Sequence, residues 1–144
     1  MSNKYIFVDY EGTLSESPSG SGENGKVLIS DLLFKDVFSE LKPIQKVKDF
    51  LLKQNTKNIF VLGIIDTAKE IKQKERWLKK HYSFIDSNNY IFVSSEHKKV
   101  EIINEYVKNN KLNKKEVVFI DDKLSHLQPA MLQGYACIDV QDIK

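Results

Sequence analysis

The sequence predicts an α/β fold: a parallel, doubly wound sheet of about five strands with helices on both faces. Short apolar runs alternate along the chain with segments of helical periodicity, which is the order of elements in such sheets. The runs are also β-branched or aromatic with little polar alternation, as in strands that are covered on both faces. The expected strands are Tyr5–Val8, Ile59–Leu62, Tyr90–Val93, Val117–Ile120 and Ala136–Val140.

Four helices are expected between these strands, because apolar side chains recur there every three or four residues. Their inward faces are predicted to consist of Ile44, Val47 and Leu51; of Ala68, Ile71, Glu75 and Leu78; of Val100, Ile103 and Val107; and of Leu127, Ala130 and Met131. Asp66 and Ser125 have the residue types of helix N-caps, and Gly134 has that of a C-cap. Pro129 predicts a late start of the last helix, near residues 125–128, because an interior proline removes a backbone hydrogen bond.

The helix expected within residues 66–81 is rich in lysine. Trp77 and Leu78 are expected to face the sheet. The lysines are expected to form a solvated outer face, which is the usual role of such a charge run. These lysines are Lys69, Lys72, Lys79 and Lys80.

Residues 15–42 interrupt the alternation of strands and helices. Ser15–Gly25 has the composition of a flexible loop. Lys26–Phe38 is rich in apolar residues, and the pattern fits either a small hairpin or a short helix near the end of the first strand. We therefore expect a single domain over residues 1–144, with a flexible loop and a small flap-like insert at about residues 15–42.

Composition gives little indication of a macromolecular partner. The net charge of +2 is close to balance, so charge alone points neither to nucleic acid nor to a membrane. Cys137 is the only cysteine, which excludes an internal disulfide and a cysteine-based zinc site. Because no secretory leader or membrane-length apolar stretch is evident, the cytoplasm is the expected location.

Acidic residues follow two of the expected strands. Ligands in parallel α/β sheets bind beyond the carboxyl ends of the strands. Asp9 ends the first strand and Asp121 and Asp122 end the fourth, whereas Gly63 and Ser94 end the second and third. The site is therefore expected at this edge, with the acids in it.

The segment DYEGTL, at residues 9–14, has the pattern of a nucleophile with an acid–base partner. Asp9 lies at the tip of an apolar strand, and Gly12 allows a tight turn beside it. Glu11 projects to the same side of an extended chain, so one carboxylate can attack while the other moves a proton. Thr13 adds a hydroxyl or backbone donor. The alternative is a strand-to-turn junction in which aspartate and glycine serve turn geometry alone.

The segment DDKLSH, at residues 121–126, has the pattern of a cation site. Two adjacent acids at the end of a buried strand are costly unless positive charge compensates them. Mg²⁺ commonly binds one or two carboxylates together with waters and a substrate phosphate. The alternative is that Asp121 and Asp122 are solvated and cap the next helix.

Together these two segments resemble the first and fourth motifs of the haloacid dehalogenase (HAD) superfamily of phosphohydrolases. The first motif is an apolar strand followed by DxDGTL, and the fourth is an apolar strand followed by DDxxxN or a close variant. The resemblance implies a Rossmann-like sheet, Mg²⁺ as cofactor, and Asp9 as the residue that becomes phosphorylated. No large cap domain is expected, because the chain has no long insert at either place where the family carries one. The metal ligands would be Asp9, the backbone near Glu11, Asp122 and, nearby, Asp121.

The resemblance also implies a lysine that balances charge around Asp9 and the phosphate. Lys99 and Lys98 are both candidates, with Lys99 slightly favoured by its spacing. The family's second motif is a serine or threonine that binds phosphoryl oxygens at the end of the second strand. Gly63 stands there, so its N–H group, or Thr67 from the next helix, would take that role. His126 replaces the usual asparagine and would either bind Asp122 or face solvent.

The implied activity is hydrolysis of phosphomonoesters, with Glu11 as general acid and base. Two departures, Glu11 for the usual aspartate and Gly63 for the usual hydroxyl residue, favour either a weak enzyme or an inactive binding or regulatory relative. A phospho-accepting receiver module is a third reading, but it would carry the acid pair after the first strand. An uncapped site suits a bulky substrate, or one whose shielding from water is completed by an oligomer partner. The expected substrate is a phosphorylated small molecule or a bulky phosphoester end, and the sequence gives no support for nucleic acid.

Overall fold

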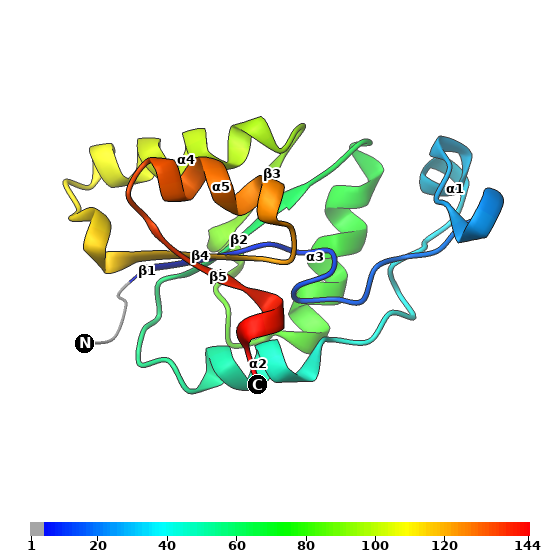
Figure 1. Ribbon diagram of the computed structural model, residues 1–144. Coiled ribbons are helices and arrows are strands. Elements are labelled where there is room, and N and C mark those ends of the chain that lie inside the picture. Colours follow the sequence, from blue (N-terminus) through cyan, green and yellow to red (C-terminus); the bar gives the residue numbers. More distant parts are fainter. Residues whose placement is uncertain (1–4) are drawn as a thin grey trace.

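The computed structural model describes residues 5–144 and contains a five-stranded, fully parallel sheet in the order β3-β2-β1-β4-β5 (Figure 1). The expected α/β fold class is confirmed. The strands are β1 (Tyr5–Val8), β2 (Ile59–Ile64), β3 (Tyr90–Val93), β4 (Val117–Asp121) and β5 (Ala136–Asp139). The helices are α1 (Ile29–Phe34), α2 (Gln45–Leu52), α3 (Lys69–His81), α4 (His97–Asn109) and α5 (Leu124–Leu132). Short 3-10 helices are η1 (Glu23–Gly25), η2 (Ser87–Asn89), η3 (Lys114–Glu116) and η4 (Val140–Asp142).

The three central strands β1, β2 and β4 bury both of their faces, which explains why their sequences are continuously apolar, whereas the edge strands β3 and β5 are only partly buried. Along β1, Ile6 and Val8 belong to one core cluster and Phe7 to the other. Helices α2 and α3 cover the first cluster through Val47, Leu51, Trp77 and Leu78. Helices α4 and α5 cover the second, through Ile103, Val107, Leu127 and Ala130. Figure 1 shows α2 and the pair α4–α5 on opposite sides of the sheet.

Several expectations about the helices are wrong in detail. Ala68 is exposed and is itself the N-cap of α3, in place of Asp66, and Lys123 rather than Ser125 is the N-cap of α5. Met131 does not face the core; it is 45% exposed, because α5 turns only one narrow side toward the sheet. Helix α5 also begins at Leu124 and contains Pro129, so the proline does not delay its start. Pro129 removes the one helical bond that its N–H would donate to the Ser125 carbonyl, and the element ends soon afterwards, before Gly134 with φ +93°.

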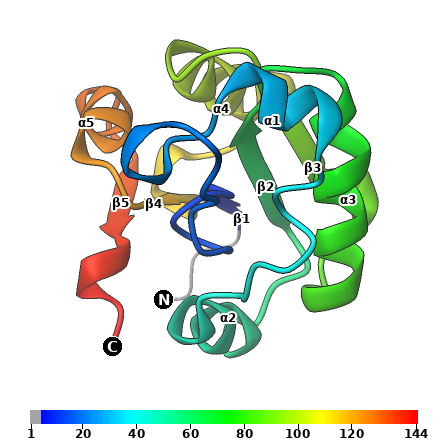
Figure 2. The ribbon, with the colours of Figure 1, turned by 90° about the vertical axis from the view of Figure 1, so that its right-hand side faces the viewer.

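The insert at residues 15–42 contains a short helix, α1, rather than a hairpin. Asp31 anchors it: the carboxylate accepts bonds from the backbone N–H and hydroxyl of Ser21 and from the N–H of Leu28. The segment packs on α3, where Trp77 Nε1 donates to Leu41 O at 2.8 Å. The segment Ser15–Gly25, expected to be a flexible loop, is therefore held by hydrogen bonds from Ser21 to the buried carboxylate of Asp31. Viewed toward the carboxyl ends of the strands, α1 lies in front of the sheet (Figure 2).

Candidate active site

The two acidic segments meet because β1 and β4 are neighbours. They pair in parallel with Val8 opposite Ile120, and the N–H of Asp9 donates to Ile120 O at 2.9 Å. Asp9 and Asp121 thus leave the sheet side by side at the carboxyl ends of their strands. Asp9, Asp121 and Asp122 each offer a carboxylate oxygen, and these oxygens lie within 4.8 Å of one another. Asp9 and Asp121 are buried and Asp122 is half-buried.

Lys99 compensates this negative charge from the first turn of α4. Its ammonium donates to Asp9 Oδ1 at 2.7 Å and to Asp121 Oδ2 at 2.9 Å, and the residue is only 1% exposed. Burial by itself would lower the pKa of Lys99, but the two carboxylates outweigh it and raise that pKa. Lys98, the other candidate, is exposed. The structure therefore brings Lys99, and not Lys98, to the acids.

The two carboxylates that share Lys99 have opposite pKa shifts. Burial raises the pKa of Asp9, and the neighbouring charge of Asp121 adds to this, although Lys99 opposes both. For Asp121, burial also favours the protonated form, but Lys99 and His126 more than offset it and lower the pKa. Asp121 therefore remains the firm counter-charge of Lys99.

His126 holds Asp121 and not Asp122, which corrects the expectation from the sequence. Its Nδ1 lies 3.1 Å from Asp121 Oδ2 and 3.1 Å from Lys99 Nζ, and the ring is buried. Its Nε2 lies 2.8 Å from Glu96 Oε2. Sequence reasoning missed Glu96. Its position just before the first turn of α4, one turn ahead of Lys99, was the available signal.

Asp122 is the member of the cluster that lacks compensation. Its Oδ1 is buried without a hydrogen-bond partner among the described residues. Burial, a hydrogen bond with Asp121 and the charges of Asp9 and Asp121 raise the pKa of Asp122 to about 7. An unpaired carboxylate oxygen beside two further carboxylates is the environment that a hard divalent cation such as Mg²⁺ satisfies. The residues present therefore fit a metal ion.

The loop after β1 wraps closely around this cluster. Thr13 donates its hydroxyl to Asp9 Oδ2 at 3.1 Å. The N–H groups of Thr13, Leu14 and Ser15 all point to the carbonyl of Tyr10. Gly12 has φ +77°, and a Cβ built on it would lie 2.2 Å from Asp122 Oδ2. Glycine is required here by the backbone conformation and by the close approach of Asp122.

The Glu11 side chain is held by an ion pair: its carboxylate lies 2.9 Å from the ammonium of Lys74 of α3. Lys74 is completely buried, unlike the four lysines expected on the outer face of this helix. The exposed lysines Lys69, Lys72, Lys79 and Lys80 follow that expectation. Lys74 could have been found from helical spacing, since it lies three and four residues before Trp77 and Leu78 and so shares their face.

The second strand supplies no hydroxyl to the cavity. Strand β2 continues past Gly63 to Ile64, and Gly63 pairs with Phe92 inside the sheet. Gly63 faces Tyr10, whereas Ile64 lines the cavity. Thr67 does not line it either; its N–H and hydroxyl donate to Glu70 at the start of α3. The expected strand end was wrong because the apolar run does not reveal where pairing stops.

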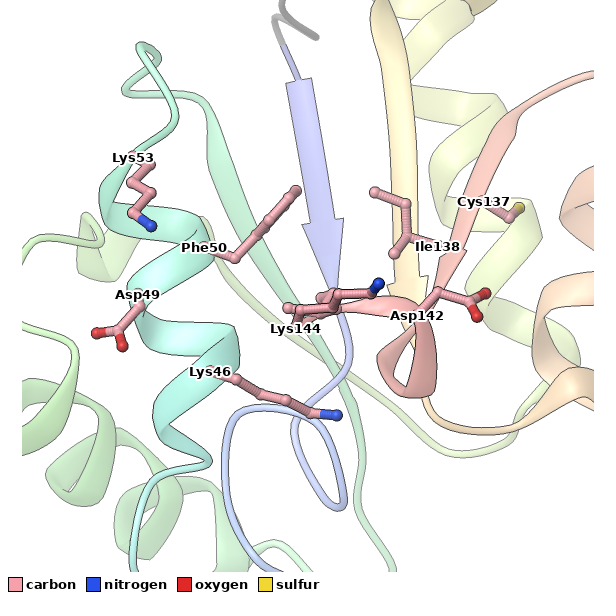
Figure 3. A pocket seen from close by; sticks show the side chains of 9 residues that line it. Lys46, Asp49, Phe50, Lys53, Cys137, Ile138, Asp142 and Lys144 are labelled. Carbon is pink, nitrogen blue, oxygen red and sulfur yellow. The ribbon is translucent and has the colours of Figure 1, made fainter.

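The cavity at the acids is small, about 60 Å³, and is lined by Asp9, Glu11, Ile64, Asp122, Lys123 and His126. A larger cavity of about 540 Å³ lies elsewhere, between α2 and β5. Figure 3 shows Phe50 and Ile138 lining it from opposite sides. It contains none of the three clustered acids, so size alone does not identify the reactive site.

These features define a parallel α/β fold with acids at the carboxyl ends of two adjacent strands. The solved structures give a match to a HAD family enzyme from Bacteroides thetaiotaomicron, with a TM-score of 0.57 and 14% sequence identity. The match covers 96% of this chain and 94% of that chain. The described residues carry no large cap domain, as expected. The sequence matches no protein-family model and no curated protein. No helix within residues 5–144 has the length and apolarity needed to cross a membrane.

Proposed function

We propose that this protein is a Mg²⁺-dependent phosphatase that hydrolyses phosphomonoesters through an aspartyl-phosphate on Asp9. The observation that carries the proposal is the buried ion pair of Asp9 with Lys99, next to the unpaired oxygen of Asp122. Asp9 lines the small cavity and is fixed on both oxygens, by Lys99 and by Thr13. A carboxylate held in this way is oriented for attack on an incoming phosphorus atom.

In the first step, a carboxylate oxygen of Asp9 forms a bond to phosphorus while the bond to the ester oxygen breaks. The leaving oxygen takes a proton from Glu11 and departs as an alcohol. In the second step, Glu11 takes a proton from water, the water oxygen bonds to phosphorus, and the bond to Asp9 breaks. Inorganic phosphate leaves, and both carboxylates return to their initial state.

The other residues of the cluster provide charge. Lys99 keeps a positive charge beside Asp9, where the phosphoryl oxygens would lie. Mg²⁺ would be held by Asp9 and Asp122, with the Glu11 carbonyl as candidate backbone ligand, and would supply positive charge for the transferring group. The Tyr10 carbonyl is already engaged by three N–H groups. Asp121 would contribute less to the metal, since Lys99, His126 and the Lys123 N–H engage its oxygens.

The small cavity favours recognition of the phosphoryl group alone. The rest of the substrate would lie outside, so both small phosphorylated molecules and bulky phosphoester ends, including nucleic-acid ends, fit the proposal. The single cysteine is consistent with a reducing compartment such as the cytoplasm.

Hydrolysis of 4-nitrophenyl phosphate by the purified protein tests the proposal. Activity should require Mg²⁺, disappear with a chelator, and be lost in Asp9→Asn. Asp66→Asn, which changes an exposed acid after β2, is the matched control and should retain activity. Undiminished turnover by Asp9→Asn would exclude Asp9 as the nucleophile.

A second function, phosphate-dependent binding without turnover, is favoured by one observation: Ile64 lines the cavity where related enzymes would offer a hydroxyl. Beryllium fluoride with Mg²⁺ separates the two, because it mimics the aspartyl-phosphate. Adduct formation at Asp9 together with hydrolysis supports the enzyme, whereas adduct formation without hydrolysis of any phosphomonoester supports the binding protein.

A further inference from the structure

Lys74 is a buried cation for which the proposed chemistry has no direct use. The side chain comes from the middle of α3 and has no exposed surface. Its ammonium donates to the carbonyl of Ile64 at 2.8 Å and lies 2.9 Å from Glu11 Oε1 and 3.5 Å from Glu70 Oε1. A buried ammonium is tolerated only with such partners, so these contacts fix where Lys74 lies.

Aromatic rings close the remaining sides of the ammonium. It lies 5.1 Å from the ring centroid of Tyr10 and 4.9 Å from that of Phe38. Both rings are completely buried, as is Lys74, so solvent does not screen the charge of its ammonium. Charge interactions are stronger in such surroundings than in solvent, and a cation lying over aromatic rings gains further attraction.

The two carboxylates around Lys74 differ in freedom. Glu70 is 2% exposed, and its second oxygen accepts bonds from the N–H groups of Asp66 and Thr67 and from the Thr67 hydroxyl. The side chain of Glu11 is 41% exposed and lines the cavity. Glu70 is therefore the fixed counter-charge. Lys74 thus has one partner that is held in place, Glu70, and one partner that reaches the cavity, Glu11.

The length of Glu11 matches this contact. Aspartate at the same position would withdraw the carboxylate by up to about 1.5 Å, the length of one C–C bond. From a starting distance of 2.9 Å, the contact with Lys74 would then exceed hydrogen-bonding range. The glutamate that stands in place of the usual aspartate thus has a physical partner.

We propose that Lys74 is a positioning residue that holds the Glu11 carboxylate at the cavity for proton transfer, and that the two residues form a matched pair. This inference rests on the proposed phosphatase function. Lys74 does not itself line the cavity; it contacts two lining residues, Ile64 through its carbonyl and Glu11 through its carboxylate, and it acts through Glu11. Glu11→Asp therefore removes the alignment, although it introduces the acid that the resembling enzymes use.

The leaving group provides a specific test. Alkyl phosphates expel a strongly basic oxygen that needs a proton, whereas 4-nitrophenolate leaves without one. We would measure kcat/KM, which reports the phosphorylation step, for propyl phosphate and 4-nitrophenyl phosphate. Glu11→Gln should lower the value for propyl phosphate by roughly a hundredfold or more, as for loss of a general acid. The value for 4-nitrophenyl phosphate should fall only about twofold if proton donation is the lost function.

Lys74→Met and Glu11→Asp should show the same selectivity, with at least about a tenfold loss confined to propyl phosphate. In the Glu11→Gln background, Lys74→Met should cause no further loss of kcat/KM that is specific to propyl phosphate. Both substitutions remove the same function, proton donation by Glu11, so their effects should not add. Lys72→Met, on the exposed face of α3, is the control and should change neither substrate. Equal losses on both substrates would overturn the proposal, since general damage to the fold does not depend on the leaving group. Should Lys74→Met fail to fold, Glu11→Asp alone decides.

A crystal structure provides a readout that does not depend on turnover. In Glu11→Asp the carboxylate should lie beyond hydrogen-bonding distance from Lys74 and be displaced in the cavity. A carboxylate that keeps its place, or wild-type crystals in which Glu11 points away from Lys74, would overturn the inference. Absence of phosphatase activity in a wild-type protein that retains the Lys74–Glu11 pair would instead count against the proposed function.

Discussion

Lys99 and Asp9 are 90 residues apart in the sequence and form an ion pair of 2.7 Å in the structure. The same ammonium binds Asp121, so one cation from α4 joins the ends of β1 and β4. Removing one partner of a buried ion pair leaves an uncompensated charge, which is typically far more destabilising than losing an exposed pair. Lys99 therefore has a role in stability as well as in the proposed chemistry.

We predict that Lys99→Met abolishes phosphatase activity and lowers the free energy of unfolding at neutral pH by roughly 3–5 kcal/mol. Urea denaturation and the 4-nitrophenyl phosphate assay measure the two effects. Lys98→Met, at an exposed neighbouring position, should leave both nearly unchanged. An unchanged free energy of unfolding in Lys99→Met would mean that the ion pair of Lys99 with Asp9 does not persist in solution.

We predict that Asp122→Asn leaves the metal-free protein at least as stable as the wild type at pH 7. The pKa of Asp122 is raised to about 7, so the folded state binds a proton more readily than the unfolded state. The contribution of Asp122 to the free energy of unfolding therefore falls as the pH rises from about 4 to 7. Asparagine does not ionise, so the variant does not lose this contribution. Thermal denaturation with and without Mg²⁺ provides the measurement: the wild type should gain stability from the metal and the variant should not.

Asp139→Asn is the control for this experiment. Asp139 pairs with Asp121 across β4 and β5 and caps the following turn, but it is not part of the acid cluster. Its substitution should leave the response to Mg²⁺ intact. Stabilisation of Asp122→Asn by Mg²⁺ equal to that of the wild type would mean that Asp122 is not a metal ligand.

We predict that Gly12→Ala weakens Mg²⁺ binding at least about tenfold, because its Cβ would displace the Asp122 carboxylate. Gly25→Ala separates this effect from backbone strain. Gly25 has φ +76°, similar to the +77° of Gly12, but a Cβ there would meet only Ser19 at 3.5 Å. Both variants should lose about 1–2 kcal/mol through the left-handed backbone. Calorimetric titration should show a changed affinity for Gly12→Ala alone.

We predict that Ile64→Thr raises kcat/KM by about tenfold, whereas Gly63→Thr does not. Ile64 lines the cavity, so a hydroxyl there can donate to a phosphoryl oxygen; about 1.5 kcal/mol for a bond to a charged group gives this factor. A Cβ at Gly63 would instead lie 3.1 Å from Tyr10 Cβ and 3.3 Å from the Phe92 ring, away from the cavity. Enzyme kinetics on both variants, with their unfolding midpoints, would decide. Improved turnover in Gly63→Thr would contradict this assignment.

We predict that Asp31 stabilises the insert at neutral pH and ceases to do so in acid. Bonds from the N–H groups of Leu28 and Ser21, and then from the Ser21 hydroxyl, hold the pKa of Asp31 well below its usual range. A lowered folded-state pKa gives stability that is present above the unfolded value of about 4 and is lost as the pH falls further. The stability difference between wild type and Asp31→Asn should therefore shrink below about pH 4 in denaturation experiments. Glu40→Gln, in the same segment, should show no such convergence.

Much of this architecture could be predicted from the sequence, because burial on both faces leaves a strong local pattern. All five strands lie where the apolar runs placed them, and the main shifts are the ends of β2, β4 and β5. Asp9 and Asp121 could be assigned to one edge since parallel strands share their carboxyl ends. The location of the acids thus followed from strand order and local pattern alone.

The tertiary structure decided how these acids are compensated. Lys98 and Lys99 are adjacent and chemically identical, and only the rotation of α4 brings Lys99 to Asp9. The sequence alone assigns Lys74 no role, yet the fold buries it and pairs it with Glu11. His126 likewise turns to Asp121 rather than to Asp122. Such pairings depend on side chains from elements far apart in the chain, and their energies come from burial, which local sequence pattern does not encode.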